Sequence, residues 1–255
     1  MIRTGTAPRV GWGLPASTLK LIACILMVVD HVGMTFFPDV MALRAVGRLA
    51  FPLFAFFIAE GCRYTRNKAK RLGLLLAVGG GFALVYALYA GEVYGNIFLT
   101  FSVSVCMIYL WQYAKRAIFE RRDALRGAGA IVLLTAALLG AAVLFRLVHF
   151  EYGYTGMLVP LFVCLLDFHG MEVSPRLAWL DTHATHLVCM AVGLVLLSLN
   201  GRMGRVQFFC LLSLIPLALY NGQVGRCGWK YGFYLFYPLH LLVIEGLALV
   251  IEHIR

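Results

Sequence analysis

Charged side chains are scarce in this 255-residue chain, at 13% of all residues. A water-soluble fold averages about 25% charged and 45–50% apolar residues, whereas hydrophobic residues here make up 62% and the mean hydropathy is +0.85. The chain therefore has too few polar side chains to cover a surface that faces water. This composition excludes a soluble α/β enzyme, a disordered chain and a secreted disulfide scaffold, and it indicates a polytopic membrane protein.

Paired cysteine motifs are also absent. Most of the seven cysteines lie inside or at the edge of apolar runs, and none is spaced as CxxC. Neither a metal knuckle nor a disulfide framework is indicated, and we expect no bound metal. The basic segment 1–17 has no apolar core and no small-residue cleavage site, so we expect no cleaved signal peptide before the first apolar run.

Long apolar runs dominate what is present. A bilayer leaves unpaired backbone groups without partners, so these runs are expected to be helical. The runs are 19–37, 43–62, 72–90, 97–114, 128–147, 153–167, 185–199, 206–220 and 231–251. With no internal repeat and no long interior linker, we expect an all-α transmembrane bundle of about nine spans (8–10) in a single domain, 1–255. The sixth, seventh and eighth runs are the best candidates for half-spans.

The net charge of +10 is concentrated in two short connections between apolar runs. The clusters are Arg63, Arg66, Lys68, Lys70 and Arg71, and then Lys115, Arg116, Arg121, Arg122 and Arg126. Lys and Arg in short loops mark the cytoplasmic side, so the N-terminus is expected to be cytoplasmic. The distribution argues against nucleic acid as a partner and favours anionic lipid heads or a phosphorylated ligand.

Two ionisable residues, Asp30 and His31, lie side by side in the first run. A charged group within a membrane costs a few kcal/mol, so it usually has a function or a partner. Adjacent helical residues diverge by about 100°, so these two cannot form one coplanar dyad. One of them is available for function while the other holds a neighbouring helix, or both simply anchor helix packing.

Arg48, in the second run, lies at nearly the depth of His31, by the helical rise of about 1.5 Å per residue. An ion pair between Arg48 and Asp30 is therefore expected. Pro52, four residues later, is expected to kink this helix and leave a carbonyl without its donor.

Polar residues elsewhere carry weaker signals. Asn96 and Thr100 enter the fourth run at i,i+4 spacing and are expected to hydrogen-bond neighbouring helices. Tyr154 lies at the start of the sixth run. His240 lies roughly 14 Å into the last run, behind a proline. Such a histidine is either a satisfied core residue or part of a site.

One physical scheme uses both the basic loops and the buried polar groups. A cytoplasmic polyanion docks on the loops and extends a neutral reactive arm into the bundle. A histidine there, whose charge adjusts near neutrality, acts as a base or a nucleophile toward an acceptor.

Four stretches resemble the TraX family, which is named for the conjugative-transfer protein that acetylates the N-terminal amine of F-type pilin. They are LKLIACILMVVDHVG, LRAVGRLAFPLFAFFIAEGCRYTRNKAKRL, GNIFLTFSV and YGFYLFYPLHLLVI. The similarity covers about residues 18–110 and 216–246. The middle, about 115–215, is similar mainly in its pattern of hydrophobic runs. TraX proteins in turn resemble the wider transmembrane acyltransferases.

The resemblance implies an acetyltransferase of the bacterial inner membrane that takes acetyl groups from cytoplasmic acetyl-CoA to an amine. Asp30 and His31 then occupy the catalytic motif, and the basic loop binds the CoA phosphates. We expect the substrate and support residues of this enzyme to be Arg48, Asn96, Tyr154 and His240. We expect its cofactor-binding residues to be Arg63, Arg66, Lys68, Lys70 and Arg71.

Alternatives stay open at this point. An O-acyltransferase of a glycan or lipid headgroup has the same general requirements. A transporter would use buried ion pairs as a gate, although no repeat symmetry is visible. A non-catalytic membrane scaffold would bind no CoA.

Overall fold

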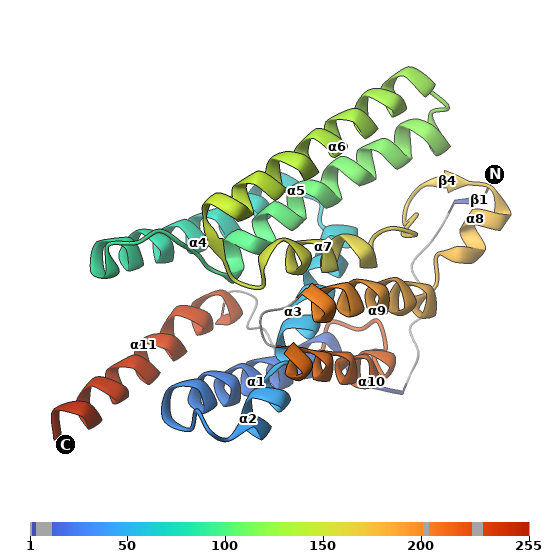
Figure 1. Ribbon diagram of the computed structural model, residues 1–255. Helices are drawn as coiled ribbons and strands as arrows, with labels where there is room; N and C mark the ends of the chain where they lie inside the picture. Colours follow the sequence, from blue (N-terminus) through green and yellow to red (C-terminus); the bar gives the residue numbers. More distant parts are fainter. Residues whose placement is uncertain (1, 4–11, 201–203, 226–231, 255) are drawn as a thin grey trace. The chain divides into compact units, whose positions relative to one another are not determined.

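The computed structural model describes residues 2–3, 12–200, 204–225 and 232–254, and most of these residues are helical (Figure 1). The helices are α1 (Ala16–Phe36), α2 (Met41–Gly47), α3 (Ala50–Tyr64), α4 (Lys68–Ala90), α5 (Ile97–Lys115), α6 (Ala124–Leu147), α7 (Gly153–Val163), α8 (Pro175–Leu180), α9 (His183–Asn200), α10 (Leu214–Ala218) and α11 (Gly232–Ile254). The shorter elements are β1 (Ile2–Arg3), β2 (Tyr94–Gly95), β3 (His149–Phe150), β4 (Glu172–Val173), the π-helical turn η1 (Arg116–Glu120) and the 3-10 helix η2 (Gly204–Ser213).

Seven helical segments of the described chain are long and apolar enough to cross a membrane, which makes this a multi-pass membrane protein. The expected number of about nine is not confirmed, because the sixth and eighth runs form the shorter helices Gly153–Val163 and Gly204–Ala218. The seventh run, expected to be a half-span, instead reaches full length at His183–Asn200. The side on which the N-terminus lies stays a prediction.

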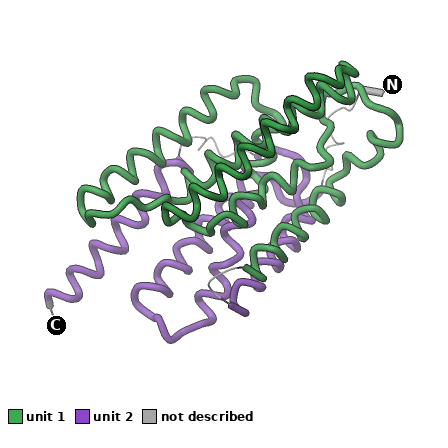
Figure 2. The backbone as a smooth tube through the Cα atoms, turned by 45° about the horizontal axis from the view of Figure 1, so that its top comes forward, with its two compact units in different colours: residues 1–7, 55–200 green, residues 8–54, 201–255 purple. Residues whose placement is uncertain are grey.

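The chain divides into two compact units (Figure 2). Unit 1 comprises residues 1–7 and 55–200, and unit 2 comprises residues 8–54 and 201–255. The boundary at 54/55 falls inside α3. The expectation of a single domain stays a prediction, and each unit is described by itself.

Unit 1 is built around α5, which packs against α4, α6 and α7, while α7 also packs against α9. Figure 1 shows α5 and α6 running side by side. At one end of the unit, β2 pairs in parallel with β3 and ties the α4–α5 connection to the α6–α7 connection. The opposite end carries the two basic clusters, at residues 63–71 and 115–126, and is called the basic end below.

Side-chain caps fix where three helices of unit 1 begin. The oxygens of Asn67, Asn96 and Asp123 accept backbone N–H groups in the first turns of α4, α5 and α6. Each cap satisfies donors that a helix start leaves without intrahelical partners, and this matters most where water is scarce.

Unit 2 is arranged around α1, which packs against α2 and α11. One face of α1 is buried and includes Leu19, Ala23 and Asp30, whereas Leu21 and Ile25 on another face are exposed. Exposed aliphatic side chains on a helix of this length are typical of a surface that faces lipid.

The second run is interrupted where Pro52 predicts a break. The helix ends at Gly47 as α2 and resumes at Ala50 as α3. Pro52 has no N–H for the carbonyl of Arg48, four residues earlier, and its ring collides with that carbonyl. The predicted kink is confirmed, and it places Arg48 at the end of α2 beside α1.

Two glycines allow α1 and α2 to approach each other closely. A Cβ on Gly33 would lie 2.7 Å from the Cβ of Leu43, and a Cβ on Gly47 would overlap the side chain of Asp30. Side chains larger than hydrogen at these positions would separate the two helices.

Replacing Gly47 by Ala tests this packing. Overpacking typically costs about 1–3 kcal/mol, so we expect Gly47→Ala to lower the thermal unfolding midpoint of the detergent-purified protein. Gly80→Ala is the matched control, because a Cβ there meets nothing within 4 Å and Ala favours helix over Gly by about 0.5–1 kcal/mol. Equal midpoints for the two variants would contradict the close approach of α1 and α2.

Candidate functional site

The carboxylate of Asp30 is buried in unit 2 and is held by two arginines. Arg48 donates to Oδ2 of Asp30 in a buried ion pair, which confirms the predicted pairing. Arg44 Nη1 lies 3.2 Å from the same oxygen and also donates to the backbone carbonyl of Asp30 at 3.2 Å. A buried carboxylate is tolerated only when paired and hydrogen-bonded, so this cluster fixes α1 against α2.

His31 turns away from this cluster toward α11. Its ring meets that of His240 edge to face, with centroids 4.9 Å apart and planes at 70°. His31 Nδ1 lies 3.3 Å from His240 Nε2. Adjacent residues of α1 thus have different neighbours, since Asp30 contacts the arginines and His31 contacts His240.

The hydrogen bonds of His31 indicate where its proton lies. Nδ1 is 2.8 Å from the carbonyl oxygen of Met27, and because a carbonyl only accepts, Nδ1 carries the hydrogen. In the neutral ring the lone pair is then on Nε2. No described residue hydrogen-bonds to that nitrogen, and the ring is only partly buried. Nε2 of His31 is thus available as a base or a nucleophile.

Lys20 lies on the same face of α1 as His31. The two are eleven residues apart, which is about three turns and roughly 16 Å of helix. Lys20 Nζ lies 5.6 Å from the ring centre of Phe233 in α11, so both side chains lie along the α1–α11 contact. Sequence reasoning did not single out Lys20, although the three-turn spacing is visible in the sequence.

Asn96 and Tyr154 belong to unit 1. Asn96 caps α5 and donates to the carbonyl of Gly79 at 2.7 Å, and Thr100 donates to the carbonyl of Glu151 at 3.0 Å. These contacts confirm that Asn96 and Thr100 bond neighbouring segments. Tyr154 meets the ring of Phe145 at 6.2 Å.

Three cations of the first basic cluster are held in place within unit 1. Lys68 donates to Gln112 at 2.9 Å and lies 4.7 Å from the ring centre of Tyr109. Arg71 donates to the carbonyl of Ile58 at 2.9 Å. The third, Arg63, is described below. Arg66 and Lys70 are exposed.

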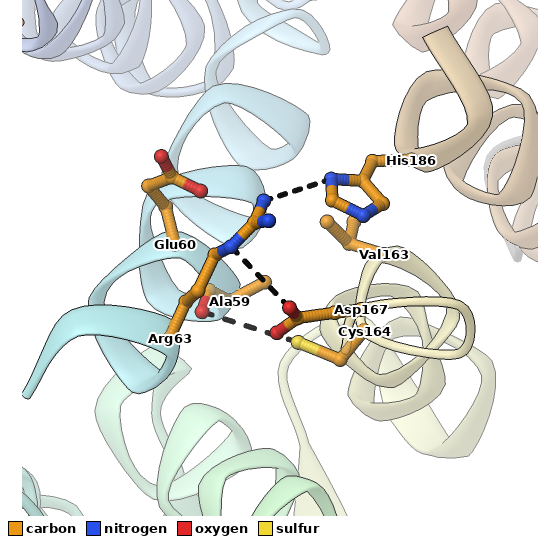
Figure 3. A pocket seen from close by; sticks show the side chains of 7 residues that line it. All are labelled: Ala59, Glu60, Arg63, Val163, Cys164, Asp167 and His186. Atoms are coloured by element: carbon orange, nitrogen blue, oxygen red, sulfur yellow. Dashed lines mark hydrogen bonds and ion pairs between the residues drawn. The ribbon is translucent and has the colours of Figure 1, made fainter. Parts of the chain in front are cut away.

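Arg63 lies at the centre of a buried network (Figure 3). Its guanidinium lies 3.3 Å from Asp167 Oδ1, 2.7 Å from Asp181 Oδ1 and 3.3 Å from His186 Nδ1. Figure 3 shows Arg63, Asp167 and His186 converging on a small crevice that Ala59 and Cys164 also line. A phosphate that bound Arg63 would have to compete with two carboxylates.

Asp167, Asp181 and His186 also have the donor set of a metal site, with ligand atoms within 4.8 Å of one another. The guanidinium of Arg63 already contacts all three. It supplies the positive charge that a metal ion would otherwise bring, so we interpret this cluster as an ion-pair network.

Lys115 and Asp181 complete the network at the basic end. Lys115 is fully buried and donates to the carbonyls of Cys164 and Asp167. Burial favours a higher pKa for the carboxyl of Asp181, but the hydrogen bond from His186 and the charge of Arg63 outweigh it, so the pKa lies below its ordinary value. The sequence did not reveal this network, because the contacts of Arg63 with Asp167, Asp181 and His186 span more than 100 residues and leave no local pattern.

Comparison with known proteins adds family information. The chain matches the family model described as TraX protein over residues 16–248. It is 28% identical to the probable fimbrial assembly protein FimC, serogroup H1, of Dichelobacter nodosus, over 90% of this chain and 93% of that protein. It is 29% identical to Protein TraX of Escherichia coli, over 91% of this chain and 86% of that protein. No solved structure shows a significant match.

Asp181→Asn tests the network around Arg63. Removing one partner of a buried ion pair costs about 3–5 kcal/mol, so we expect a clearly lower unfolding midpoint at neutral pH. Asp39→Asn, at an exposed position, should change stability by less than about 0.5 kcal/mol.

The same pair of variants has an expected pH dependence. Because folding lowers the pKa of Asp181, its contribution is full above the unfolded-state pKa and is lost as the pH falls through the folded-state pKa. The gap in midpoint between wild type and Asp181→Asn should therefore narrow in acid. A gap that is constant with pH, or no gap at neutral pH, would contradict the network.

Proposed function

The chain belongs to the TraX family, and from that premise we propose that it is a membrane acetyltransferase that moves an acetyl group from acetyl-CoA to an amine. The observation that carries the proposal is Nε2 of His31, to which no described residue hydrogen-bonds, beside a buried ion-pair cluster in an apolar bundle. An imidazole nitrogen in such a place is suited to proton transfer or nucleophilic attack.

The reaction needs one proton to move. The acceptor nitrogen attacks the thioester carbonyl, a C–N bond forms, and the C–S bond breaks. His31 Nε2 takes the proton from the attacking amine and returns it to the leaving sulfur, so the products are an acetamide and the CoA thiol. A route through a transient acetyl-histidine uses the same nitrogen as nucleophile, and both routes remain within the proposal.

Asp30 acts through position. Its carboxylate is committed to Arg44 and Arg48, so it anchors the α1–α2 contact one residue before His31. The proposal therefore assigns proton transfer to His31 and assigns Asp30 and Arg48 to holding the helix that carries it.

Lys20 is suited to bind a phosphate of the acyl donor. It lies about three turns from His31 on the same helix face, a separation comparable to the extended arm that joins the phosphates of acetyl-CoA to its thioester. An ammonium group is a suitable phosphate partner. The basic loop of unit 1, with exposed Arg66 and Lys70, stays the proposed alternative contact for the CoA phosphates.

The acceptor is proposed from the relatives. The name of one relative refers to fimbrial assembly, so the N-terminal amine of a pilin subunit is the first acceptor to test. The cytoplasmic membrane is the proposed location, because there acetyl-CoA is available on one side.

His31→Ala tests the proposal directly. General acid–base catalysis typically contributes about 10²–10⁴-fold, so we expect acetyl transfer to fall by at least about a hundredfold with an unchanged unfolding midpoint. His253→Ala, at an exposed position near the end of α11, is the control and should retain activity. Full transfer by a folded His31→Ala protein would end the assignment.

Substitution of Lys20 tests the donor path. A hydrogen bond to a charged group contributes about 1.5–3 kcal/mol, so Lys20→Met should raise the KM for acetyl-CoA by about tenfold or more with little change in kcat. Lys20→Arg keeps the charge and should stay near wild type. An unchanged KM in Lys20→Met would place the phosphate contact elsewhere, such as the basic loop.

A further inference from the structure

His240 is the buried partner of His31 on α11. Only 7% of its surface is exposed. Its ring stacks on Phe236, with centroids 5.2 Å apart and planes at 9°, and meets Tyr237 edge to face at 5.6 Å. The ring is therefore held on two sides by residues of its own helix, and its Nε2 edge faces α1.

The hydrogen bonds of His240 determine which nitrogen faces His31 as an acceptor. Nδ1 of His240 lies 2.9 Å from the carbonyl oxygen of Phe236, so this nitrogen carries the hydrogen. The lone pair of the neutral ring is then on Nε2, which lies 3.3 Å from Nδ1 of His31. The proton on His31 Nδ1 is shared between the carbonyl of Met27 and the lone pair of His240.

Resting on the proposed function of His31, we propose that His240 is a positioning residue that accepts the Nδ1–H of His31 and keeps the unprotonated Nε2 of His31 directed at the substrates. The two hydrogen bonds run in one direction: His31 Nδ1–H donates to His240 Nε2, and His240 Nδ1–H donates to the carbonyl of Phe236. Reversing the tautomer of either ring would leave two donors or two acceptors facing each other.

The carbonyl of Met27 does not fix the orientation of the His31 ring alone. In α1 it also receives the backbone N–H of His31, four residues later, and it belongs to the same helix as the ring. Among the described residues, His240 ties the orientation of the ring to a second helix. When Nε2 of His31 takes a proton from the amine, the Nδ1–H becomes part of a cation and donates more strongly to His240. No proton passes to His240, and none is lost from the reaction.

Three substitutions separate this role from packing. In His240→Gln, the side-chain carbonyl oxygen of the glutamine can occupy the position of Nε2 of His240 and accept a hydrogen bond from His31. In His240→Asn, the shorter side-chain amide can occupy only the position of Nδ1 of His240, so it can keep the contact with the carbonyl of Phe236 but cannot accept from His31. His240→Phe keeps an aromatic ring and has no acceptor.

The experiment combines nitrogen NMR of 15N-histidine protein in detergent with acetyl-transfer kinetics, and the His31 signals are identified by their loss in His31→Ala. In wild type we expect a protonated Nδ1 and an unprotonated Nε2 on His31. His240→Gln should keep this pattern and keep kcat within about fivefold of wild type. His240→Asn and His240→Phe should mix the two tautomers and lower kcat by at least about tenfold, with the KM for acetyl-CoA unchanged.

A wild-type ring with its proton on Nε2 of His31, or a His240→Asn protein with wild-type NMR pattern and kcat, would overturn the inference. If wild-type protein transfers no acetyl group, the proposed function fails. The NMR pattern still decides the role of His240 in that case, so the two failures are distinguishable.

Discussion

The ion-pair cluster of Asp30 with Arg44 and Arg48 is the constraint on which the site depends. A carboxylate in an apolar bundle must be paired, because leaving it unpaired costs several kcal/mol. The pairing requires α2 to end beside α1, and the break before Pro52 provides this geometry. It also requires close contact between the helices, which Gly47 permits. The break, the glycine and the position of the second helix are thus all needed for the pairing of one buried charge.

His31, the residue after Asp30 in α1, faces a different helix. Asp30 and His31 diverge by about 100° around α1, so the anchored carboxylate and the available imidazole face different partners. A rigid ion pair one residue away limits how far the ring of His31 can move, and His240 contacts it from α11. The arrangement has the general logic of an activated base that is oriented by a third group.

Several features could be predicted from the sequence because their causes are local or depend only on depth in the membrane. Hydropathy and the need to pair backbone groups in a bilayer predict the apolar helices. Pro52 predicts the break, and matching depth predicts the pair of Asp30 with Arg48. The contact of His31 with His240 spans 209 residues, and only the family resemblance placed His240 near the site. The network of Arg63 with Asp167, Asp181 and His186 was missed, because polar residues in a connecting segment give the same pattern whether they are solvated or paired with a distant cation.

The central claim is that acetyl-CoA reaches His31. The most direct measurement is an electron cryo-microscopy structure of the detergent-purified protein with a non-hydrolysable acetyl-CoA analogue. The account predicts that the acyl carbon of the analogue lies near Nε2 of His31, either in contact at about 3–3.5 Å or with room for one amine nitrogen between them. An analogue bound at a site from which the ring is walled off, or no bound analogue at saturating concentration, would contradict it.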